Sequence, residues 1–201
     1  VDAHKWLYTA LEAGCVLVKD QKYLIDAFAT YPSYYSGKQI AHNNEVSDLY
    51  TMGPQNSRHF KALKVWLTLQ FIGKDGYTTA ISQNMAQARS LFNILKNTSD
   101  FEPFTCNLSI VTFRYVPEDL NSISTEINVH QYLNSLNAKL MTNIQRSGTL
   151  YLSNANIDDY KLLRVCIVNY RTNSQDINDA PQLIRKFGKA LDAEMRMSFG
   201  N

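Results

Sequence analysis

Two closely spaced pairs of strand-like segments most constrain how this 201-residue chain can fold. The first pair fills 101–116 and is broken near Asn107; the second consists of 149–153 and 162–169, separated by a turn-like segment at 156–159. Strands joined by short turns pair in antiparallel fashion, because parallel pairs need a long crossover connection. The pattern therefore predicts a largely antiparallel sheet in the second half of the chain.

Helical segments flank both strand pairs, with apolar residues recurring at three- and four-residue steps. Four helices are expected here. The first begins at a cap on Asn56 or Ser57 and ends at Gly73, and the second begins at about Thr78 after a turn at 74–76. The third runs from about Ser124 to 147–148, and the last has Pro181 in its first turn. Their expected inward residues are Phe60, Leu63, Leu67 and Phe71, then Ile81, Met85, Ala88, Leu91 or Phe92, and Leu95, then Val129, Leu133, Leu136, Leu140 and Ile144, and finally Leu183, Phe187, Leu191 and Met195. The order of elements predicts a small α+β unit in which helices cover the sheet.

The region before this unit is less regular. Residues 14–19 form a compact apolar run that predicts a buried strand. Asp20 is a candidate cap for a short helix that carries Tyr23, Leu24 and Phe28 on one face. Periodicity is absent from 29 to 57, and a loop of that length in a compact domain is usually functional or mobile.

Composition excludes several classes of protein. The 20 Lys and Arg residues nearly balance the 18 Asp and Glu residues, so the net charge of +2 gives no basis for binding nucleic acid or an anionic membrane. No apolar run approaches the roughly 20 residues that span a bilayer, and no secretory leader is visible. The three dispersed cysteines indicate small buried hydrophobes in a reducing, cytoplasmic compartment: Cys15, Cys106 and Cys166. The histidines share no ligand spacing with cysteines or carboxylates, so no metal site is expected at His42, His59 or His130.

The start of the chain concentrates different kinds of chemistry in the run Asp2-Ala3-His4-Lys5-Trp6. A lysine amine attacks carbonyl carbons when desolvation or a neighbouring cation lowers its pKa. His4 could stack on a ring, donate to a phosphate or relay a proton. The alternative is that Lys5 is a solvated surface cation and His4 is a polar residue with its hydrogen bonds satisfied.

Two further features could belong to a site. The tyrosines at 31, 34 and 35 could place a phenol in a cleft as a proton donor, or could serve as half-buried packing residues. Arg164 lies in an apolar strand and needs an anionic partner, which is either a structural carboxylate or a bound ligand.

The run Val1-Asp2-Ala3-His4-Lys5-Trp6-Leu7 closely resembles the cofactor-lysine motif of the group II pyridoxal-phosphate-dependent amino-acid decarboxylases. This family includes the aromatic-amino-acid, histidine and glutamate decarboxylases. Further segments resemble the family in the same order along the chain: Gly14–Lys19, Tyr31–Tyr34, Gly53–Arg58 leading into Ala62–Leu67, and Leu162–Val165.

The resemblance implies an α/β protein of fold type I, the C-terminal part of a pyridoxal-phosphate-dependent enzyme. Residues 1–58 would end the large cofactor-binding domain and include the catalytic loop. Residues 59–201 would form the small C-terminal α+β domain. The expected partners are the N-terminal half of the same enzyme, as the same gene product or a separate chain, and a second subunit in a homodimer.

The resemblance also implies roles for individual residues. Lys5 matches the lysine that holds pyridoxal 5′-phosphate as a Schiff base. His4 and Asp2 match positions near the cofactor phosphate; many relatives have Asn at the second, and since a carboxylate repels phosphate, Asp2 is expected to contribute only its backbone. Tyr34 matches the loop tyrosine that acts as proton donor, and its neighbour Tyr35 is the competitor for that role. Ser57 matches a residue that contacts the partner subunit's cofactor. Arg164 matches an arginine that binds the substrate carboxylate, a role that varies across the family.

The implied activity is decarboxylation of an L-amino acid to its amine and carbon dioxide, in a site that also needs the N-terminal half. Two alternatives stay open. One is a non-catalytic C-terminal fragment that acts as a folding or dimerisation module. The other is a pyridoxal-phosphate-dependent aminotransferase or lyase of the same fold, which Tyr34 and the His-Lys-Trp context disfavour.

Overall fold

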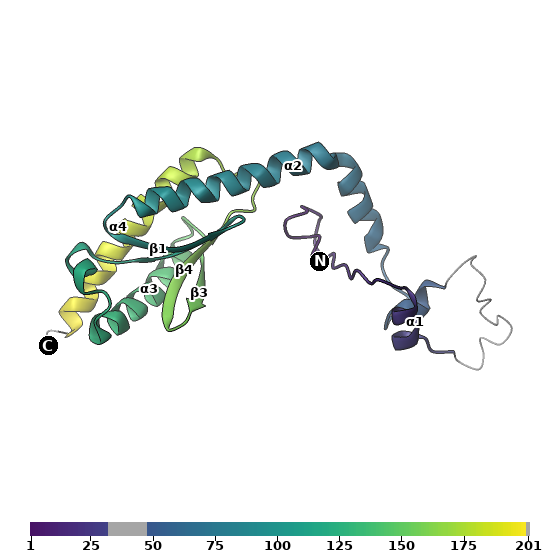
Figure 1. Cartoon of the computed structure of the whole chain (residues 1–201), viewed down its shortest axis with the longest axis horizontal. Coiled ribbons are helices and arrows are strands. Elements are labelled where there is room, and N and C mark those ends of the chain that lie inside the picture. Colours follow the sequence, from purple (N-terminus) through teal and green to yellow (C-terminus); the bar gives the residue numbers. More distant parts are fainter. Residues whose placement is uncertain (32–47, 200–201) are drawn as a thin grey trace. The chain divides into compact units, whose positions relative to one another are not determined.

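The computed structural model describes residues 1–31 and 48–199 and divides into two compact units, 1–74 and 75–201 (Figure 1). The first unit holds α1 (Lys22–Phe28), the 3-10 helix η2 (Leu49–Met52) and the beginning of α2 (Lys61–Lys96). The second holds the rest of α2, then β1 (Phe101–Asn107), β2 (Ile110–Tyr115), the 3-10 helix η3 (Glu118–Ile123), α3 (Ile127–Ser147), β3 (Ser153–Ile157), β4 (Tyr160–Cys166) and α4 (Ser174–Phe199). Among the described helices, none has a stretch long and apolar enough to cross a membrane. The domain boundary expected at 58/59 stays a prediction.

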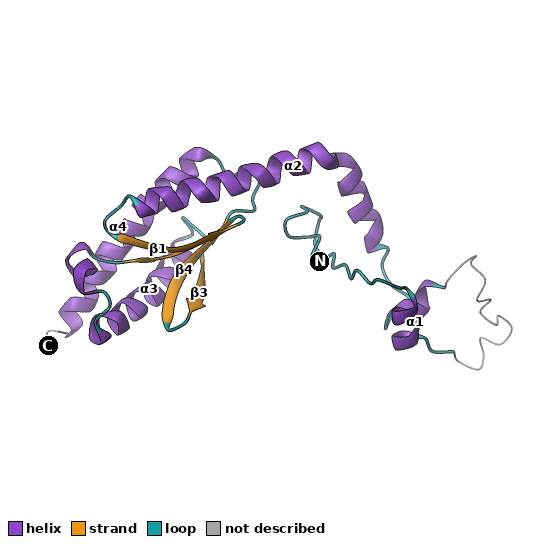
Figure 2. Ribbon diagram, in the orientation of Figure 1, coloured by secondary structure: helices purple, strands orange, loops and turns teal. Residues whose placement is uncertain are grey.

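The four strands form one sheet in the order β1-β2-β4-β3, and every neighbouring pair is antiparallel. Figure 2 shows the strands in orange with α3 and α4 beside them. The first hairpin lies where the sequence places it, with its turn at Leu108, which has a left-handed φ of 51°. The prediction of a small α+β unit with a mostly antiparallel sheet is confirmed.

The second hairpin differs from the expected one. The segment expected as a strand at 149–153 is mostly loop, and β3 begins only at Ser153. Leu152 is buried and its carbonyl accepts a hydrogen bond from Gln145 Nε2 at 2.7 Å, so this part of the chain packs under α3 as a loop. The edge strand β3 is instead formed by the polar residues that follow, 153–157. The turn of this hairpin consists of Asp158 and Asp159 and is shorter than the predicted turn at 156–159.

Two helix boundaries also differ from their predictions. Helix α2 begins at Lys61 rather than after Asn56 or Ser57. Gly73 interrupts it with φ 67° and ψ 173°, as a stop signal should, but the chain is helical again from Lys74, so the turn expected at 74–76 is wrong.

The last helix starts earlier than Pro181 suggested. Asn173 Oδ1 accepts hydrogen bonds from the backbone N–H groups of Gln175 and Asp176, and Asp176 Oδ2 accepts one from Asn173 N–H at 2.9 Å. This reciprocal cap fixes the helix start at Ser174. Pro181 therefore lies inside α4 and is buried, and its assignment to the first turn is wrong.

The hydrophobic core belongs to the second unit. All members of the buried cluster lie between Ala88 and Met195, and the inward stripe of α3 is among them as predicted: Leu133, Leu136, Leu140 and Ile144. Gly148 ends α3 in the left-handed conformation with φ 69°, as its sequence indicated.

Residues 1–31 and 48–74, the described part of the first unit, contribute nothing to that cluster. The strand expected at 14–19 is wrong: only Gly14 pairs, in a single bridge to Asp2, and Val16 and Leu17 are exposed. A buried strand needs hydrogen-bonded neighbours and covered faces, and the described residues supply one bridge. The short helix after Asp20 is confirmed, because Asp20 Oδ1 accepts a hydrogen bond from Lys22 N–H at 2.9 Å ahead of α1.

Gly188 in α4 allows a close approach between this helix and β2. A Cβ atom at this position would lie 2.6–2.8 Å from three ring carbons of Tyr115, which is itself buried. We expect Gly188→Ala to destabilise the fold by about 1–2 kcal/mol, because overpacking outweighs the gain in helix propensity. Urea unfolding measures this change. Gly76→Ala is the matched control, since Gly76 is helical and exposed and its substitution should stabilise slightly. Equal effects of the two substitutions would contradict the argument.

Candidate active site

The lysine motif lies in a closed loop, residues 1–15, which we call the lysine loop. Its two ends are joined by the Asp2–Gly14 bridge and by a hydrogen bond from Cys15 N–H to the Val1 carbonyl at 2.7 Å. Inside the loop, Thr9 N–H donates to the Ala3 carbonyl at 3.1 Å. The small residues Ala3 and Ala13 are buried, so the loop has a compact interior despite its exposed side chains.

Lys5 is presented at a turn of this loop. Its backbone N–H donates to the Asp2 carbonyl at 3.0 Å, and its Nζ lies 2.6 Å from Asp2 Oδ2. The side chains of Lys5 and Asp2 are 70% and 44% exposed. The hydrogen bond and charge of the Lys5 ammonium hold the pKa of the Asp2 carboxyl below its ordinary value. The motif thus presents an accessible amine beside a carboxylate.

His4 is half-buried and held by the opposite side of the loop. Its Nδ1 lies 3.0 Å from the Ala13 carbonyl and accepts a hydrogen bond from Ala13 N–H at 3.2 Å. Both contacts use the same ring nitrogen, and no hydrogen bond to Nε2 forms within the described residues. Nε2 is therefore the ring nitrogen left for a ligand.

The other predicted site residues belong to separate parts of the chain. Ser57 is exposed in the segment ahead of α2. Tyr34 and Tyr35 lie outside the described residues, so the choice between them stays a prediction. Arg164 belongs to the second unit, on β4, where its Nη1 donates to Ser153 Oγ at 3.2 Å. Within the described ranges no carboxylate lies at ion-pair distance from Arg164, so the structural salt bridge considered for it is not found there.

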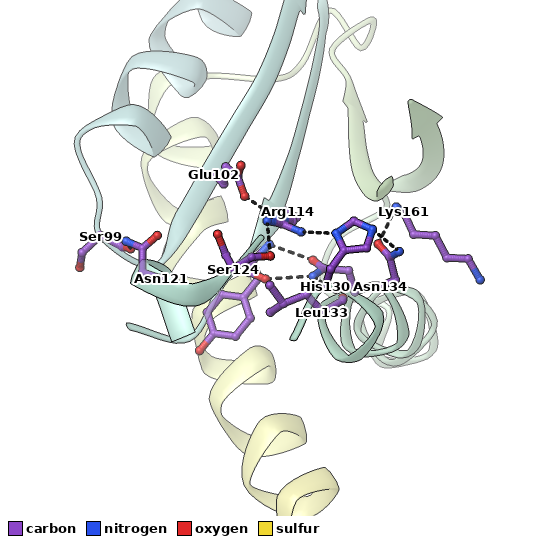
Figure 3. A network of polar contacts seen from close by, with 11 residues as sticks. Ser99, Glu102, Arg114, Asn121, Ser124, His130, Leu133, Asn134 and Lys161 are labelled. Atoms are coloured by element: carbon purple, nitrogen blue, oxygen red, sulfur yellow. Dashed lines mark hydrogen bonds and ion pairs between the residues drawn. The ribbon is translucent and has the colours of Figure 1, made fainter. Parts of the chain in front are cut away.

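The arginine that has a structural carboxylate is Arg114 on β2, which the sequence analysis missed. Its side chain is fully buried and its Nε donates to Glu102 on the neighbouring strand. Figure 3 shows its guanidinium between Glu102 and His130, with Nη1 3.4 Å from His130 Nδ1. The ring of Tyr160 lies 4.9 Å from its Cζ. The group is satisfied on all sides and belongs to the fold of the second unit.

The expectation that all three cysteines are buried is also wrong. Cys15 and Cys166 are exposed and only Cys106 is partly buried. Cys15 lies in the apolar run that forms no strand. Cys166 is the last residue of β4 and points away from the core, whereas Ile167, which follows it, is buried.

Comparison with known proteins agrees with the fold and with the family that the sequence resembles. The family described as "Pyridoxal-dependent decarboxylase conserved domain" matches residues 1–116. An aromatic-L-amino-acid decarboxylase of Bacillus atrophaeus is 32% identical over 200 residues, which are 99% of this chain and 39% of that protein. The structure of Oryza sativa TDC with PLP and tryptamine superposes with a TM-score of 0.81 at 23% identity, covering 94% of this chain and 38% of the other. Catharanthus roseus tryptophan decarboxylase in complex with L-tryptophan gives a TM-score of 0.74 at 25% identity, with the same 94% and 38% coverage.

The fold is therefore that of a fold type I pyridoxal-phosphate enzyme, in its C-terminal part. The chain belongs to the group II pyridoxal-dependent decarboxylase family, as its sequence motifs suggested. It spans less than two fifths of the relatives it matches, 39% of the Bacillus atrophaeus protein and 38% of the two structures.

Proposed function

We propose that this chain is the lysine-bearing portion of an enzyme that decarboxylates an L-amino acid to its amine and carbon dioxide. The observation that carries the proposal is the lysine loop: it displays Lys5 on a fixed turn with an accessible Nζ, inside the segment that matches the decarboxylase family. The first matched relatives are named for aromatic L-amino acids, tyrosine and DOPA, which makes an aromatic amino acid the preferred substrate class.

The lysine loop fits pyridoxal 5′-phosphate at two of the three motif side chains expected near it, which are Lys5 and His4. Lys5 Nζ is exposed enough to bond the aldehyde carbon of the cofactor, and His4 Nε2 is free to donate to its phosphate. The Asp2 carboxylate does not fit a phosphate, because both are anionic and Asp2 already pairs with Lys5. When bound, the pyridine ring supplies the electron sink that decarboxylation requires.

This chain's residues would then bind, orient and supply protons. Lys5 tethers the cofactor and the ring of His4, fixed by Ala13, orients its phosphate. Tyr34 donates its phenolic proton to the substrate carbon that has lost carbon dioxide, and closure of its loop would exclude water from that step. Ser57 reaches the cofactor of a partner subunit, and Arg164 binds a carboxylate of the substrate.

Catalysis would also need the rest of the family fold. No described residue of the first unit belongs to the buried hydrophobic cluster, and most of the exposed large hydrophobic residues of the described chain belong to this unit: Val1, Leu11, Val16, Leu17, Val18, Tyr23, Phe28, Tyr31, Leu49, Phe60, Leu63, Trp66, Leu67, Leu69 and Phe71. Apolar surface on this scale usually marks an interface. It supports a partner that corresponds to the N-terminal half of the relatives, within a homodimer. Without that partner the chain would be a non-catalytic folding or dimerisation module.

Borohydride reduction of the natively purified protein tests the proposal. Denaturing mass spectrometry of every polypeptide present should show a phosphopyridoxyl adduct that maps to Lys5, together with the polypeptide that completes the fold. Incubation with aromatic L-amino acids should release carbon dioxide and amine. An unmodified Lys5 in a decarboxylating preparation would overturn its assignment, and a keto acid product would favour an aminotransferase.

The loop tyrosine makes a separate prediction. Tyr34→Phe removes a hydroxyl and no ring atoms, so loss of the proton donor should lower the rate of amine formation about 10²-fold or more, the order associated with a general acid. Tyr35→Phe is the matched control and should leave that rate within a few-fold of the original. Amine quantified by chromatography measures both variants. A larger loss in Tyr35→Phe would transfer the role to Tyr35.

A further inference from the structure

The resemblance leaves the side chain of Asp2 without a role, because its carboxylate would repel the phosphate beside which the motif places it. The structure offers another partner. Asp2 Oδ2 lies 2.6 Å from Lys5 Nζ, a charge-assisted contact between the first acid of the motif and the amine that would bond the cofactor.

The backbone of the lysine loop holds Asp2 and Lys5 in positions where their side chains meet. Asp2 and Lys5 stand three residues apart and are the two ends of a turn closed by the hydrogen bond from Lys5 N–H to the Asp2 carbonyl at 3.0 Å. The bridge between Asp2 and Gly14 fixes the position of the acid from the other side. The first atom that a Cβ on Gly14 would meet is Asp2 Oδ1 at 3.9 Å, so this wall of the loop leaves room for the carboxylate.

We propose that Asp2 is a positioning residue that holds the ammonium of Lys5 whenever that amine is not bonded to cofactor. The proposal rests on the proposed function for the role of Lys5 as the cofactor lysine, but the contact between Asp2 and Lys5 itself requires no cofactor. The pairing directs the Lys5 side chain along the turn. Because an ammonium is not a nucleophile, Lys5 would have to give a proton to solvent before it could bond a cofactor aldehyde. Bond formation would expel the aldehyde oxygen as water and draw the Lys5 nitrogen away from Asp2, leaving the Asp2 carboxylate near the phosphate, so the acid would oppose retention of the cofactor.

The test measures the reactivity of Lys5 in protein stripped of cofactor. Trace acetylation with acetic anhydride at fixed pH, followed by peptide mass spectrometry, gives the relative rate at each lysine. Asp2→Asn should raise the acetylation rate of Lys5 about two- to five-fold, the range for loss of an exposed ion pair. Asp2→Glu restores the charge and should return the rate toward that of the original protein. After reloading with limiting pyridoxal 5′-phosphate and reduction with borohydride, the fraction of Lys5 that carries the phosphopyridoxyl adduct should be higher in Asp2→Asn than in the original protein.

The chain provides a matched control in the same unit. Glu12 pairs with Lys61 at 2.5 Å, and that contact likewise holds the pKa of its carboxyl below the ordinary value. Glu12→Gln should raise the acetylation rate of Lys61 and leave that of Lys5 unchanged. Asp2→Asn should raise the rate of Lys5 and leave that of Lys61 unchanged. A Lys5 rate that ignores Asp2→Asn while Lys61 responds to Glu12→Gln would overturn the proposal.

A second measurement covers the case in which Asp2→Asn disturbs the loop. In Lys5→Met, carbon NMR should show the pKa of the Asp2 carboxyl rising toward its ordinary value while that of Glu12 is unchanged; an unmoved Asp2 would also refute the pairing. The two proposals fail separately. Absence of a phosphopyridoxyl adduct on Lys5 defeats the proposed function, whereas an adduct combined with indifference to Asp2 defeats only this inference.

Discussion

Replacing Lys5 with alanine should lower kcat/KM for amino-acid decarboxylation by at least about 10³-fold in the native enzyme that contains this chain, the order of loss expected for a positioned catalytic group. On the proposed function, two roles of Lys5 would be lost together: the covalent tether of the cofactor and the amine that would return to it when product leaves. Lys5 is exposed and belongs to no core, so the fold should tolerate the change. The measurement is steady-state kinetics with the same borohydride trap, which should yield no adduct.

Two control variants separate chemistry from charge. Lys5→Arg keeps the positive charge beside Asp2, but a guanidinium stays protonated and cannot form the bond, so it should be as inactive as alanine. Lys22→Ala removes an exposed lysine at the start of α1 and should leave activity within about two-fold. Activity in Lys5→Arg above a few per cent of the original would contradict covalent tethering by this residue.

Local sequence signals predicted the parts of the fold that local physics decides. The stripe of α3 follows from leucines at helical spacing, and its end follows from a glycine that adopts positive φ without strain. The first hairpin follows from two apolar runs too close together for anything but an antiparallel pair. In each case the residues that determine the structure are neighbours in the chain.

Errors arose where a distant contact decides. The run 150–152 resembles a strand, but it is a loop whose Leu152 is buried and bonded to α3. The polar run after it forms the edge strand because β4 offers hydrogen bonds there. Arg114 and Arg164 both interrupt apolar strands. Only their surroundings distinguish them, since Glu102, His130 and Tyr160 reach Arg114 from separate segments of the chain.

The candidate site shows a similar division. The role of Lys5 came only from the resemblance of the His-Lys-Trp motif to the family, and it stays a prediction. The Asp2–Lys5 contact was missed, although their spacing was visible, because it depends on a turn that only the closed lysine loop creates. A signal was available: an acid and a lysine three residues apart at a tight turn can meet.

The fold of the second unit depends on one buried amide, Asn137 on α3. Its Oδ1 accepts from Tyr115 N–H at 2.8 Å, and its Nδ2 donates to the carbonyls of Tyr115 and Leu133, each at 2.9 Å. Tyr115 pairs with Phe101 of β1, but the ladder between β2 and β4 ends at the Phe113–Leu163 pair, so the Asn137 side chain takes the place of a strand partner on the β4 side of Tyr115. One turn earlier, Asn134 Oδ1 does the same for the N–H of Lys161 at 2.9 Å.

Asn137→Ala should therefore destabilise the protein by about 2–5 kcal/mol, because it strands a buried N–H and a buried carbonyl on Tyr115, each costing about 1–3 kcal/mol. Asn137 is only 1% exposed, so water cannot replace the amide without opening the core. Asn134→Ala is the matched control on the same helix. Asn134 Oδ1 accepts from Lys161 N–H and its Nδ2 donates to the Asp159 carbonyl at 2.8 Å, both at exposed positions where water can substitute. Its remaining contact, from Nδ2 to His130 Nε2 at 3.1 Å, is only partly buried, so the cost should be about 1 kcal/mol. Urea unfolding with a common m-value measures both. Equal losses would mean that the missing strand, rather than burial, sets the cost, and a loss below about 1 kcal/mol in Asn137→Ala would show that Tyr115 finds another partner.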